Sequence, residues 1–442
     1  MKKVWFYILI SFLAGIITYY LPLGIPDQAH IVLSILITVG ALWFTEAIPL
    51  HATALLIPFL IVLFTDTSVK DVFAPFFDPV VILLMGGFTL AYGLRKFHLD
   101  EEIAYYFVNK IGTSPRKFLL AIMFVAAFLS MWMSNSATTA IMIPIVLVVL
   151  STSGLKHLES SYAKSAVLGV AYAATIGGLA TIVGTTPNAI AVKFLADQGV
   201  NISFTGWMYH ALPLVIFLLP ITWLVLTLMY KPEIKELKVR KHVSHLTKSQ
   251  KKTLAIFFIT VILWLTTSIH GVSSFMVALI PILLFYFLKM FDVKDFGRIH
   301  WDILILVGGG LSLGSAIISS GLNSVIASAM QGVITGNPLF IMLFIVSIFC
   351  IIFTLVSSNT GTASFVIPII IPLAMALGID IRILAILAGI AVSLDFMVPV
   401  GTPPNAIAYS TRYVRLRDMV KSGIVIAIIG ALLLSGFAFL YW

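Results

Sequence analysis

The fold of this chain is decided by a short segment, Gly184-Thr185-Thr186-Pro187-Asn188-Ala189-Ile190-Ala191. The segment returns in the second half of the chain as Gly401-Thr402-Pro403-Pro404-Asn405-Ala406-Ile407-Ala408, with seven of the eight positions identical. Because proline has no backbone amide and disfavours helix in the residue before it, each copy should interrupt a helix. We predict that Thr402 and Pro403 lie in an unwound link between two half-helices and that Asn188 and Asn405 cap the second half-helices.

Two further echoes occur in the same order along the chain. Ser134-Asn135-Ser136-Ala137-Thr138 returns as Ser358-Asn359-Thr360-Gly361-Thr362, and Pro144 and Pro368 follow the two copies at the same spacing. Residues 78–90, which contain a Gly-Gly pair, are similar to residues 302–313, which contain three consecutive glycines. Together the three echoes define internal repeats over residues 78–206 and 302–418.

The composition excludes a soluble protein. Of the 442 residues, 60% are hydrophobic and 10% are charged, and the mean hydropathy is +1.09, whereas a soluble domain has about a quarter charged residues. Long apolar runs also exclude a disordered chain and a transmembrane β-barrel. An all-α polytopic membrane protein with about ten to twelve membrane segments remains. The single cysteine, Cys350, excludes an intramolecular disulfide and a cysteine metal cluster, and we expect it to pack or to face lipid.

Charged residues give the expected orientation. Lys2 and Lys3 precede the first apolar run, whereas the loop of residues 22–29 carries Asp27 and no lysine or arginine. The positive-inside rule therefore places the N-terminus in the cytoplasm, and the first run, which has no small-residue cleavage site, is interpreted as the first span. Residues 231–252 should form a basic cytoplasmic linker between the two halves. Loop topology thus explains the net charge of +9 without nucleic-acid binding.

The repeated polar segments predict a binding site inside the membrane. Lipid cannot satisfy free backbone groups, so broken helices at bilayer depth must be buried in protein. Each serine-asparagine triplet lies between two apolar runs, which favours the tip of a re-entrant hairpin. Helix N-termini at such breaks attract anions, whereas free carbonyls and asparagine or serine oxygens suit a hard cation such as sodium. A single triplet in a membrane helix more often only makes hydrogen bonds to a neighbouring helix. Its duplication favours an anion site with cations nearby.

These motifs resemble those of the divalent anion/sodium symporters (DASS, or INDY-type, transporters), which carry paired Ser-Asn-Thr triplets and paired Gly/Ala-Thr/Ser-Pro-Pro-Asn links. Trp43-Phe44-Thr45-Glu46-Ala47-Ile48-Pro49-Leu50 is also similar to an early signature of that family, and the resemblance covers about residues 30–440. It implies about 11 transmembrane helices plus two re-entrant hairpins in two inverted repeats, assembled as a homodimer. It also implies an elevator mechanism, in which a transport domain slides against a scaffold. Residues 1–77 and 207–301 would belong to the scaffold, and residues 419–442 would form a C-terminal helix.

The resemblance also implies which residues bind substrate and ions. Substrate carboxylates would contact Asn135, Ser136, Thr185, Asn359, Thr360, Thr402 and Pro403. One sodium ion would be held around Ser130, Ser134, Asn135 and Gly184, and a second around Thr354, Ser357, Ser358, Asn359 and Gly401. Two residues depart from the family pattern, because Ser136 replaces a usual threonine and Thr186 replaces a usual proline. The first change removes a methyl group from the substrate site, and the second restores an amide donor beside the first ion site.

We therefore expect a secondary active transporter that moves small dicarboxylates, such as succinate, malate or fumarate, across the cytoplasmic membrane by sodium symport. A sodium-independent exchanger of the same fold is the alternative, and an ion channel or an intramembrane enzyme is more distant. The sequence contains no intramembrane protease motif and no phosphate-binding loop. No cofactor other than coupling sodium is expected, and the expected partners are the dicarboxylate, membrane lipid and a second copy of the chain.

A few ionisable residues lie outside the repeated motifs. We expect His51, His210 and His270 to be interfacial or packing residues, because they lack the spacing of metal ligands. Glu46 and Asp395 lie in apolar stretches, where an ionisable residue is a candidate for function. Glu46 is assigned to structure. Asp395, shortly before Gly401, either supports the second ion site or makes a hydrogen bond at a helix end.

Overall fold

The computed structural model describes residues 2–110, 113–238, 246–334, 336–355, 357–399 and 401–442. Within these ranges every regular element is helical, which confirms the prediction of an all-α protein. Among the described residues, eight helical segments are long and apolar enough to cross a membrane, and four shorter apolar helices accompany them. The chain is therefore a multi-pass membrane protein, and the expected number of spans stays a prediction.

The N-terminal helices form a layer against the start of the second repeat. They are α1 (Lys2–Tyr20), α2 (Asp27–Thr45), α3 (Leu50–Phe64), α4 (Val69–Phe73) and the 3-10 helix η1 (Ala74–Phe77). Helix α1 runs along α2, and α3 packs on α17 (Trp301–Ser319). This packing depends on Gly309 of α17, where a β-carbon would lie 2.5 Å from the carbonyl oxygen of Ala54 in α3. A larger residue at position 309 would push the two helices apart.

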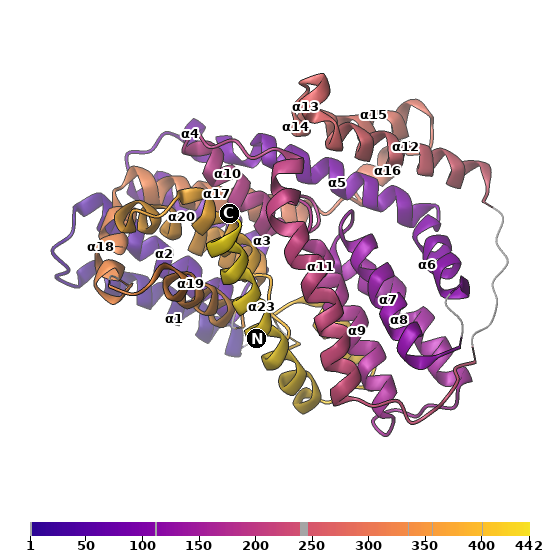
Figure 1. Ribbon diagram of the computed structural model, residues 1–442. Helices are drawn as coiled ribbons and strands as arrows, with labels where there is room; N and C mark the ends of the chain where they lie inside the picture. The colour runs from indigo at the N-terminus through magenta and orange to yellow at the C-terminus, as the bar shows by residue number, and fades with distance from the viewer. Residues whose placement is uncertain (1, 111–112, 239–245, 335, 356, 400) are drawn as a thin grey trace.

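The first repeat contains a helical hairpin followed by a broken helix. Its helices are α5 (Pro79–Lys96), α6 (Leu99–Lys110), α7 (Pro115–Ser130), α8 (Asn135–Thr152), α9 (Ser161–Gly178) and α10 (Thr186–Asp197). Helices α7 and α8 form the hairpin and pack on α9, beside α11 (Phe204–Met229) (Figure 1). Residues 179–185 form the link between the half-helices α9 and α10.

The second repeat follows the same order. After α17 come α18 (Leu322–Ile334), α19 (Leu339–Thr354), α20 (Asn359–Leu377), α21 (Ile381–Ala391), α22 (Pro403–Ser410) and α23 (Leu416–Leu440). Helices α19 and α20 form the hairpin, and α21 and α22 are the two half-helices. Cys350 of α19 is fully buried, so it is a packing residue rather than one that faces lipid.

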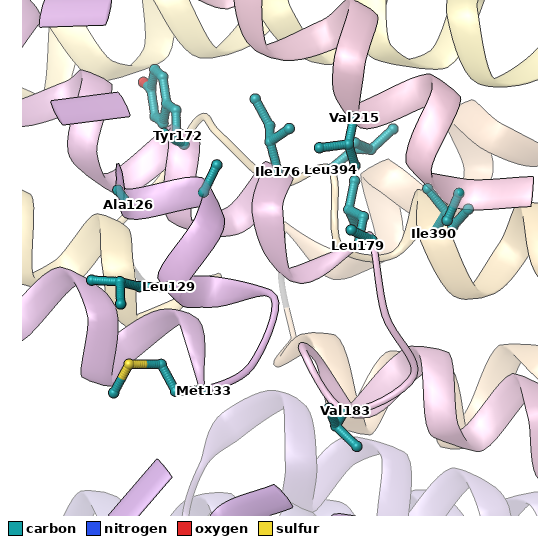
Figure 2. Packing of buried hydrophobic residues seen from close by; sticks show 14 of the residues in the cluster. Ala126, Leu129, Met133, Tyr172, Ile176, Leu179, Val183, Val215, Ile390 and Leu394 are labelled. Atoms are coloured by element: carbon teal, nitrogen blue, oxygen red, sulfur yellow. The ribbon is translucent and has the colours of Figure 1, made fainter. Parts of the chain in front are cut away.

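The two repeats are packed crosswise. Half-helix α10 of the first repeat packs on α20 and α21 of the second, whereas α22 of the second packs on α8 and α9 of the first. Figure 2 shows the core of this arrangement, in which Leu179 and Val183 of the first link belong to the same buried cluster as Ile390 and Leu394 of the second repeat. Each link is thereby brought to the hairpin of the other repeat.

The segment between the repeats lies along one edge of the molecule. After α11 it contains α12 (Lys248–Leu265), α13 (Thr267–His270), α14 (Ser274–Val277), α15 (Leu279–Phe287) and α16 (Val293–Phe296). Helices α12, α14 and α15 pack on α5 (Figure 1). At the end of α5, Lys96 Nζ lies 2.6 Å from Asp295 Oδ2, and Tyr92 Oη donates to Asp295 Oδ1 at 2.7 Å. Burial alone would raise the pKa of Asp295, but hydrogen bonds from Lys96, the Asp292 amide and Tyr92 outweigh it and lower that pKa.

The described part of the basic linker is bound to the ends of the first repeat's helices. The Leu237 amide donates to the Thr113 carbonyl at 2.8 Å, and the Lys238 amide donates to Ser153 Oγ at 2.9 Å. The carboxylate of Glu233 accepts from the Tyr162 amide at 2.9 Å. The linker's Arg240 and Lys241 lie outside the described residues.

Candidate functional site

The tips of the two hairpins have the same local structure. Ser134 is the N-cap of α8, where its Oγ accepts from the Ala137 amide at 3.3 Å. Ser358 is the N-cap of α20, where its Oγ accepts from the Gly361 amide at 3.1 Å. Serine suits this position because its short side chain satisfies a free amide of the first helical turn.

A hydroxyl at the end of each preceding helix holds the asparagine of the triplet. Ser130 Oγ donates to Asn135 Oδ1 at 2.7 Å, and Thr354 Oγ1 hydrogen-bonds the side-chain amide of Asn359 at 2.8 Å. Ser130 and Thr354 are fully buried behind the two asparagines. The two copies of the triplet therefore share the same hydrogen-bond arrangement as well as a similar sequence.

The links differ from the prediction in two details. Pro403 lies inside α22 as its first residue rather than in the link, because proline needs no amide partner at the start of a helix. The N-cap positions of α10 and α22 are Thr185 and Thr402, so the prediction that Asn188 and Asn405 cap these helices was wrong.

Asn188 and Asn405 instead bind backbone carbonyls in and beside the link that precedes their own helix. Asn188 Nδ2 donates to the carbonyl oxygens of Gly178 and Thr181 at 3.0 and 2.8 Å. Asn405 Nδ2 donates to those of Asp395 and Val398 at 3.2 and 3.1 Å. Each asparagine therefore ties the first turn of its half-helix to the backbone of the link and fixes the shape of the link.

The tips and links open into one cavity of about 340 Å³. All seven residues expected to contact substrate line it, as do Ser134, Gly184, Ser358 and Gly401 from the expected ion sites. Ser130, Thr354 and Ser357 are not among the lining residues. Positions from opposite halves of the sequence are thus brought to one place by the crosswise packing of the repeats.

Four helix N-termini meet at this cavity. The N-cap residues of α8, α10, α20 and α22 all line it, namely Ser134, Thr185, Ser358 and Thr402. No lysine or arginine of the described chain lines it. Because helix N-termini carry free amides and partial positive charge, the cavity can hold an anion without a basic side chain.

Oxygen atoms suited to a hard cation lie beside the second hairpin tip. The side-chain amide of Asn359 lies 3.3 Å from the carbonyl oxygens of both Val392 and Gly401. Groups of three or more histidine, cysteine, aspartate or glutamate side chains that could hold a metal are absent from the described residues. The donor set is therefore one of carbonyl, amide and hydroxyl oxygens, which are ligands typical of sodium rather than of zinc.

The cavity wall opposite the links contains residues that the sequence analysis missed. His51 of α3 and His300, the N-cap of α17, line the cavity together with Asp302 and Phe88. The rings of His300 and Phe88 meet edge to face with centroids 5.6 Å apart. His51 was expected to be an interfacial or packing residue, and its place in the cavity lining was not predicted.

His210 and His270 do have local partners. His210 Nδ1 lies 2.7 Å from the Gly206 carbonyl, and His270 Nε2 lies 2.8 Å from the Leu263 carbonyl. Both contacts join residues within a few positions along the chain. These two histidines are packing residues, as expected.

A hydrogen bond between two residues that line the cavity joins the two repeats. It joins the hydroxyl of Thr186, at the start of α10, to the hydroxyl of Thr360 in the first turn of α20. Thr186 is the position where a proline was expected from the resemblance. The substitution therefore adds a contact to a residue of the expected substrate site, which a proline could not make.

Broken helices and hairpins around a cavity lined by helix N-termini are typical of secondary transporters. A model of the family described as "Sodium:sulfate symporter transmembrane region" matches residues 1–442. The chain belongs to this family, the divalent anion/sodium symporters, which confirms the resemblance seen in the sequence. The family and the relatives below are transporters, so the alternative of an intramembrane enzyme is excluded.

Several relatives cover nearly the whole chain. An uncharacterized transporter of Methanocaldococcus jannaschii is 35% identical over 97% of this chain and 98% of its own length. The sodium-dependent dicarboxylate transporter SdcS of Staphylococcus saprophyticus is 33% identical over 91% of this chain and 84% of its own. Among solved structures, the YdaH transporter of Alcanivorax borkumensis has a TM-score of 0.61 at 15% identity, covering 87% of this chain and 89% of its own. That structural likeness shows a shared fold.

Proposed function

We propose that this transporter carries small dicarboxylates, such as succinate, malate or fumarate, across the cytoplasmic membrane together with sodium. The observation that carries the proposal is the meeting of four helix N-termini at one cavity that no lysine or arginine of the described chain lines. The names of the SdcS relatives, sodium-dependent dicarboxylate transporters at 32–33% identity, support the same substrate and ion.

The pairing of the N-termini suits an anion with two carboxylates. Helix α8 packs on α22, and α10 packs on α20, so the four N-termini form two pairs. Each pair combines one hairpin with one half-helix of the other repeat. One carboxylate would face Asn135, Ser136 and Thr402, and the other would face Thr185, Asn359 and Thr360. Carboxylates held by amides and hydroxyls leave the cavity without breaking an ion pair to lysine or arginine, which favours turnover over tight binding.

Sodium would bind behind the two asparagines. The first site would use Ser130, Ser134, Asn135 and Gly184, and the second would use Thr354, Ser357, Ser358, Asn359 and Gly401. Sodium at these positions would supply positive charge next to the substrate carboxylates. Binding of ion and anion would then be coupled, because each lowers the electrostatic cost of the other.

The rest of the proposed mechanism follows the family. Residues 78–206 and 302–418 would form the moving repeats, and residues 1–77 and 207–301 would contain the scaffold of a homodimer. The cavity would move across the membrane as a unit, in the manner of an elevator. The N-terminus and the linker of residues 231–252 would be cytoplasmic, as their lysines suggest.

Uptake of radiolabelled succinate into proteoliposomes tests the proposal. Uptake into empty vesicles driven by an inward sodium gradient is the expected result. Uptake that ignores sodium and needs internal unlabelled succinate would instead establish the exchanger alternative. Uptake of labelled sulfate but not of succinate would refute the substrate.

Two matched variants locate the site in the same assay. Asn135→Ala and Asn359→Ala should each abolish uptake while the protein still reaches the membrane, because each removes an amide shared by substrate and ion. Full activity of both variants would contradict the site assignment. Gly436→Ala, at a position of α23 with open space around it, is the control.

A further inference from the structure

One pair of corresponding positions beside the links differs in charge between the repeats. Gly178 precedes Gly184 by the same number of positions as Asp395 precedes Gly401, so the two residues correspond in the repeats. The structure keeps this equivalence, because Asn188 binds the carbonyl of Gly178 and Asn405 binds the carbonyl of Asp395. The second link therefore carries a carboxylate where the first link has no side chain.

The carboxylate of Asp395 lies against Gly401. A β-carbon on Gly401 would lie only 1.5 Å from Asp395 Oδ2 and 3.2 Å from the carbonyl oxygen of Thr354. The space beside Gly401 is thus filled by Asp395 Oδ2 and bordered by the Thr354 carbonyl. The carbonyl of Gly401 itself accepts from the side-chain nitrogen of Asn359 at 3.3 Å, so the Asp395 carboxylate lies among residues of the second expected ion site.

Asp395 has no counter-charge within the described chain. Its side chain is fully buried, and Oδ1 accepts from the Met397 amide at 3.2 Å. Oδ2 has no hydrogen-bond partner, and no salt bridge of the described residues includes Asp395. Burial of an uncompensated charge is costly, so a nearby cation would stabilise this carboxylate in its charged form.

The first link, all of which lies within the described residues, has no such group. There a β-carbon on Gly184 would lie 2.5 Å from the Gly178 carbonyl, and one on Gly178 would lie 2.2 Å from Asn135 Oδ1. Neutral oxygens of the described chain therefore surround the first site. The two sites have similar geometry but different charge.

We propose that Asp395 gives the second sodium site a fixed negative charge, so that this site binds sodium more tightly than the first. The proposal rests on the sodium coupling proposed above and goes beyond it by making the two ion sites unequal. Asp395 acts as a ligand or as a close positioning charge for the ion at Gly401 and Asn359.

Sodium-dependent thermal unfolding of the purified protein tests this role without transport. Unfolding is followed by tryptophan fluorescence in detergent, with substrate absent and choline chloride keeping the ionic strength constant. Wild-type protein should become more stable as sodium rises. In Asp395→Asn the sodium concentration that gives half of this stabilisation should rise by at least about tenfold, because a unit charge within a few ångströms of the ion is lost.

Two further variants keep the result interpretable. The double variant Asp395→Gly with Gly401→Ala removes the charge and fills the vacated space with a methyl group, so it should show the same loss of sodium affinity in a repacked site. Glu46→Gln removes a carboxylate at the exposed end of α2 and should keep the wild-type sodium dependence.

The outcomes separate this proposal from the proposed function. An unchanged sodium midpoint in both charge-free variants would overturn the role of Asp395 and leave sodium coupling standing. A wild-type protein without any sodium-dependent stabilisation would overturn sodium coupling and, with it, the inequality of the sites. A raised midpoint in Asp395→Asn and in the double variant, with Glu46→Gln unchanged, is the expected result.

Discussion

Replacement of Gly178 by alanine tests how tightly the first link is packed against the first hairpin tip. The new β-carbon would lie 2.2 Å from Asn135 Oδ1, 3.0 Å from its Cγ and 3.2 Å from its Nδ2. Ordinary contact begins near 3.4 Å, so the amide would have to retreat by about 1 Å. That movement breaks the 2.7 Å hydrogen bond from Ser130 Oγ to Asn135 Oδ1.

The expected loss of stability can be worked out from these contacts. Overpacking of a buried site costs about 1–3 kcal/mol, and loss of a buried hydrogen bond costs about 1 kcal/mol more. Gly178→Ala should therefore cost about 2–4 kcal/mol and lower the unfolding temperature in detergent by several degrees. Uptake should also be lost, because Asn135 belongs to the proposed sites of both substrate and sodium.

A double-mutant cycle separates local overpacking from a general helix effect. Asn135→Ala removes the atoms that the new methyl group would strike, so Gly178→Ala should cost little in that background. Gly436→Ala, with nothing within 4 Å of its new β-carbon, is the matched control and should not reduce stability. Equal costs of Gly178→Ala with and without Asn135 would refute the packing argument.

Three other changes probe the surroundings of the site. Thr186→Val removes the hydrogen bond to Thr360 and should raise the KM for dicarboxylate uptake by about 3–10-fold, with unchanged sodium dependence of unfolding. His51→Phe narrows the cavity, so competition assays should show a greater loss for five-carbon than for four-carbon dicarboxylates. Asp295→Asn should lower the unfolding temperature at pH 7. Because the folded pKa of Asp295 is lowered, its contribution to stability is fully present above the unfolded value of about 3.8 and is lost as the pH falls through the lower folded value, so the difference should shrink below pH 3.8. A constant difference at all pH values would contradict this reasoning.

The sequence predicted the parts of the site that are encoded locally. The repeated glycine- and proline-containing segments around Pro187 and Pro404 predicted two broken helices, and the duplication of Ser134 to Thr138 pointed to a second, equivalent tip. The cavity gathers those residues because each half-helix packs on the other repeat. The residues of the tips and links that line the cavity could therefore be selected from the sequence without any knowledge of that packing.

The remaining features depend on contacts that no local pattern encodes. His51 and His300 reach the cavity from α3 and from the start of α17, and neither belongs to a repeated motif. The direction of the Asn188 amide depends on where α9 ends rather than on the helix that Asn188 itself belongs to. Asp395 was recognised as unusual for a membrane protein, but only the packing of Gly401 against its carboxylate indicates what it faces.

The exchange of half-helices between the repeats bears on how such a protein is assembled. Helix α8 of the first repeat packs on α22 of the second, and α20 of the second repeat packs on α10 of the first. Neither repeat therefore contains both helices of a pair. A polypeptide of one repeat would finish its site only by swapping half-helices with a second copy. In the single chain, both partners of each pair are supplied by one polypeptide. The cavity lies where the two repeats meet, and a chain cut within residues 231–252 would regain it only when its two halves associate again.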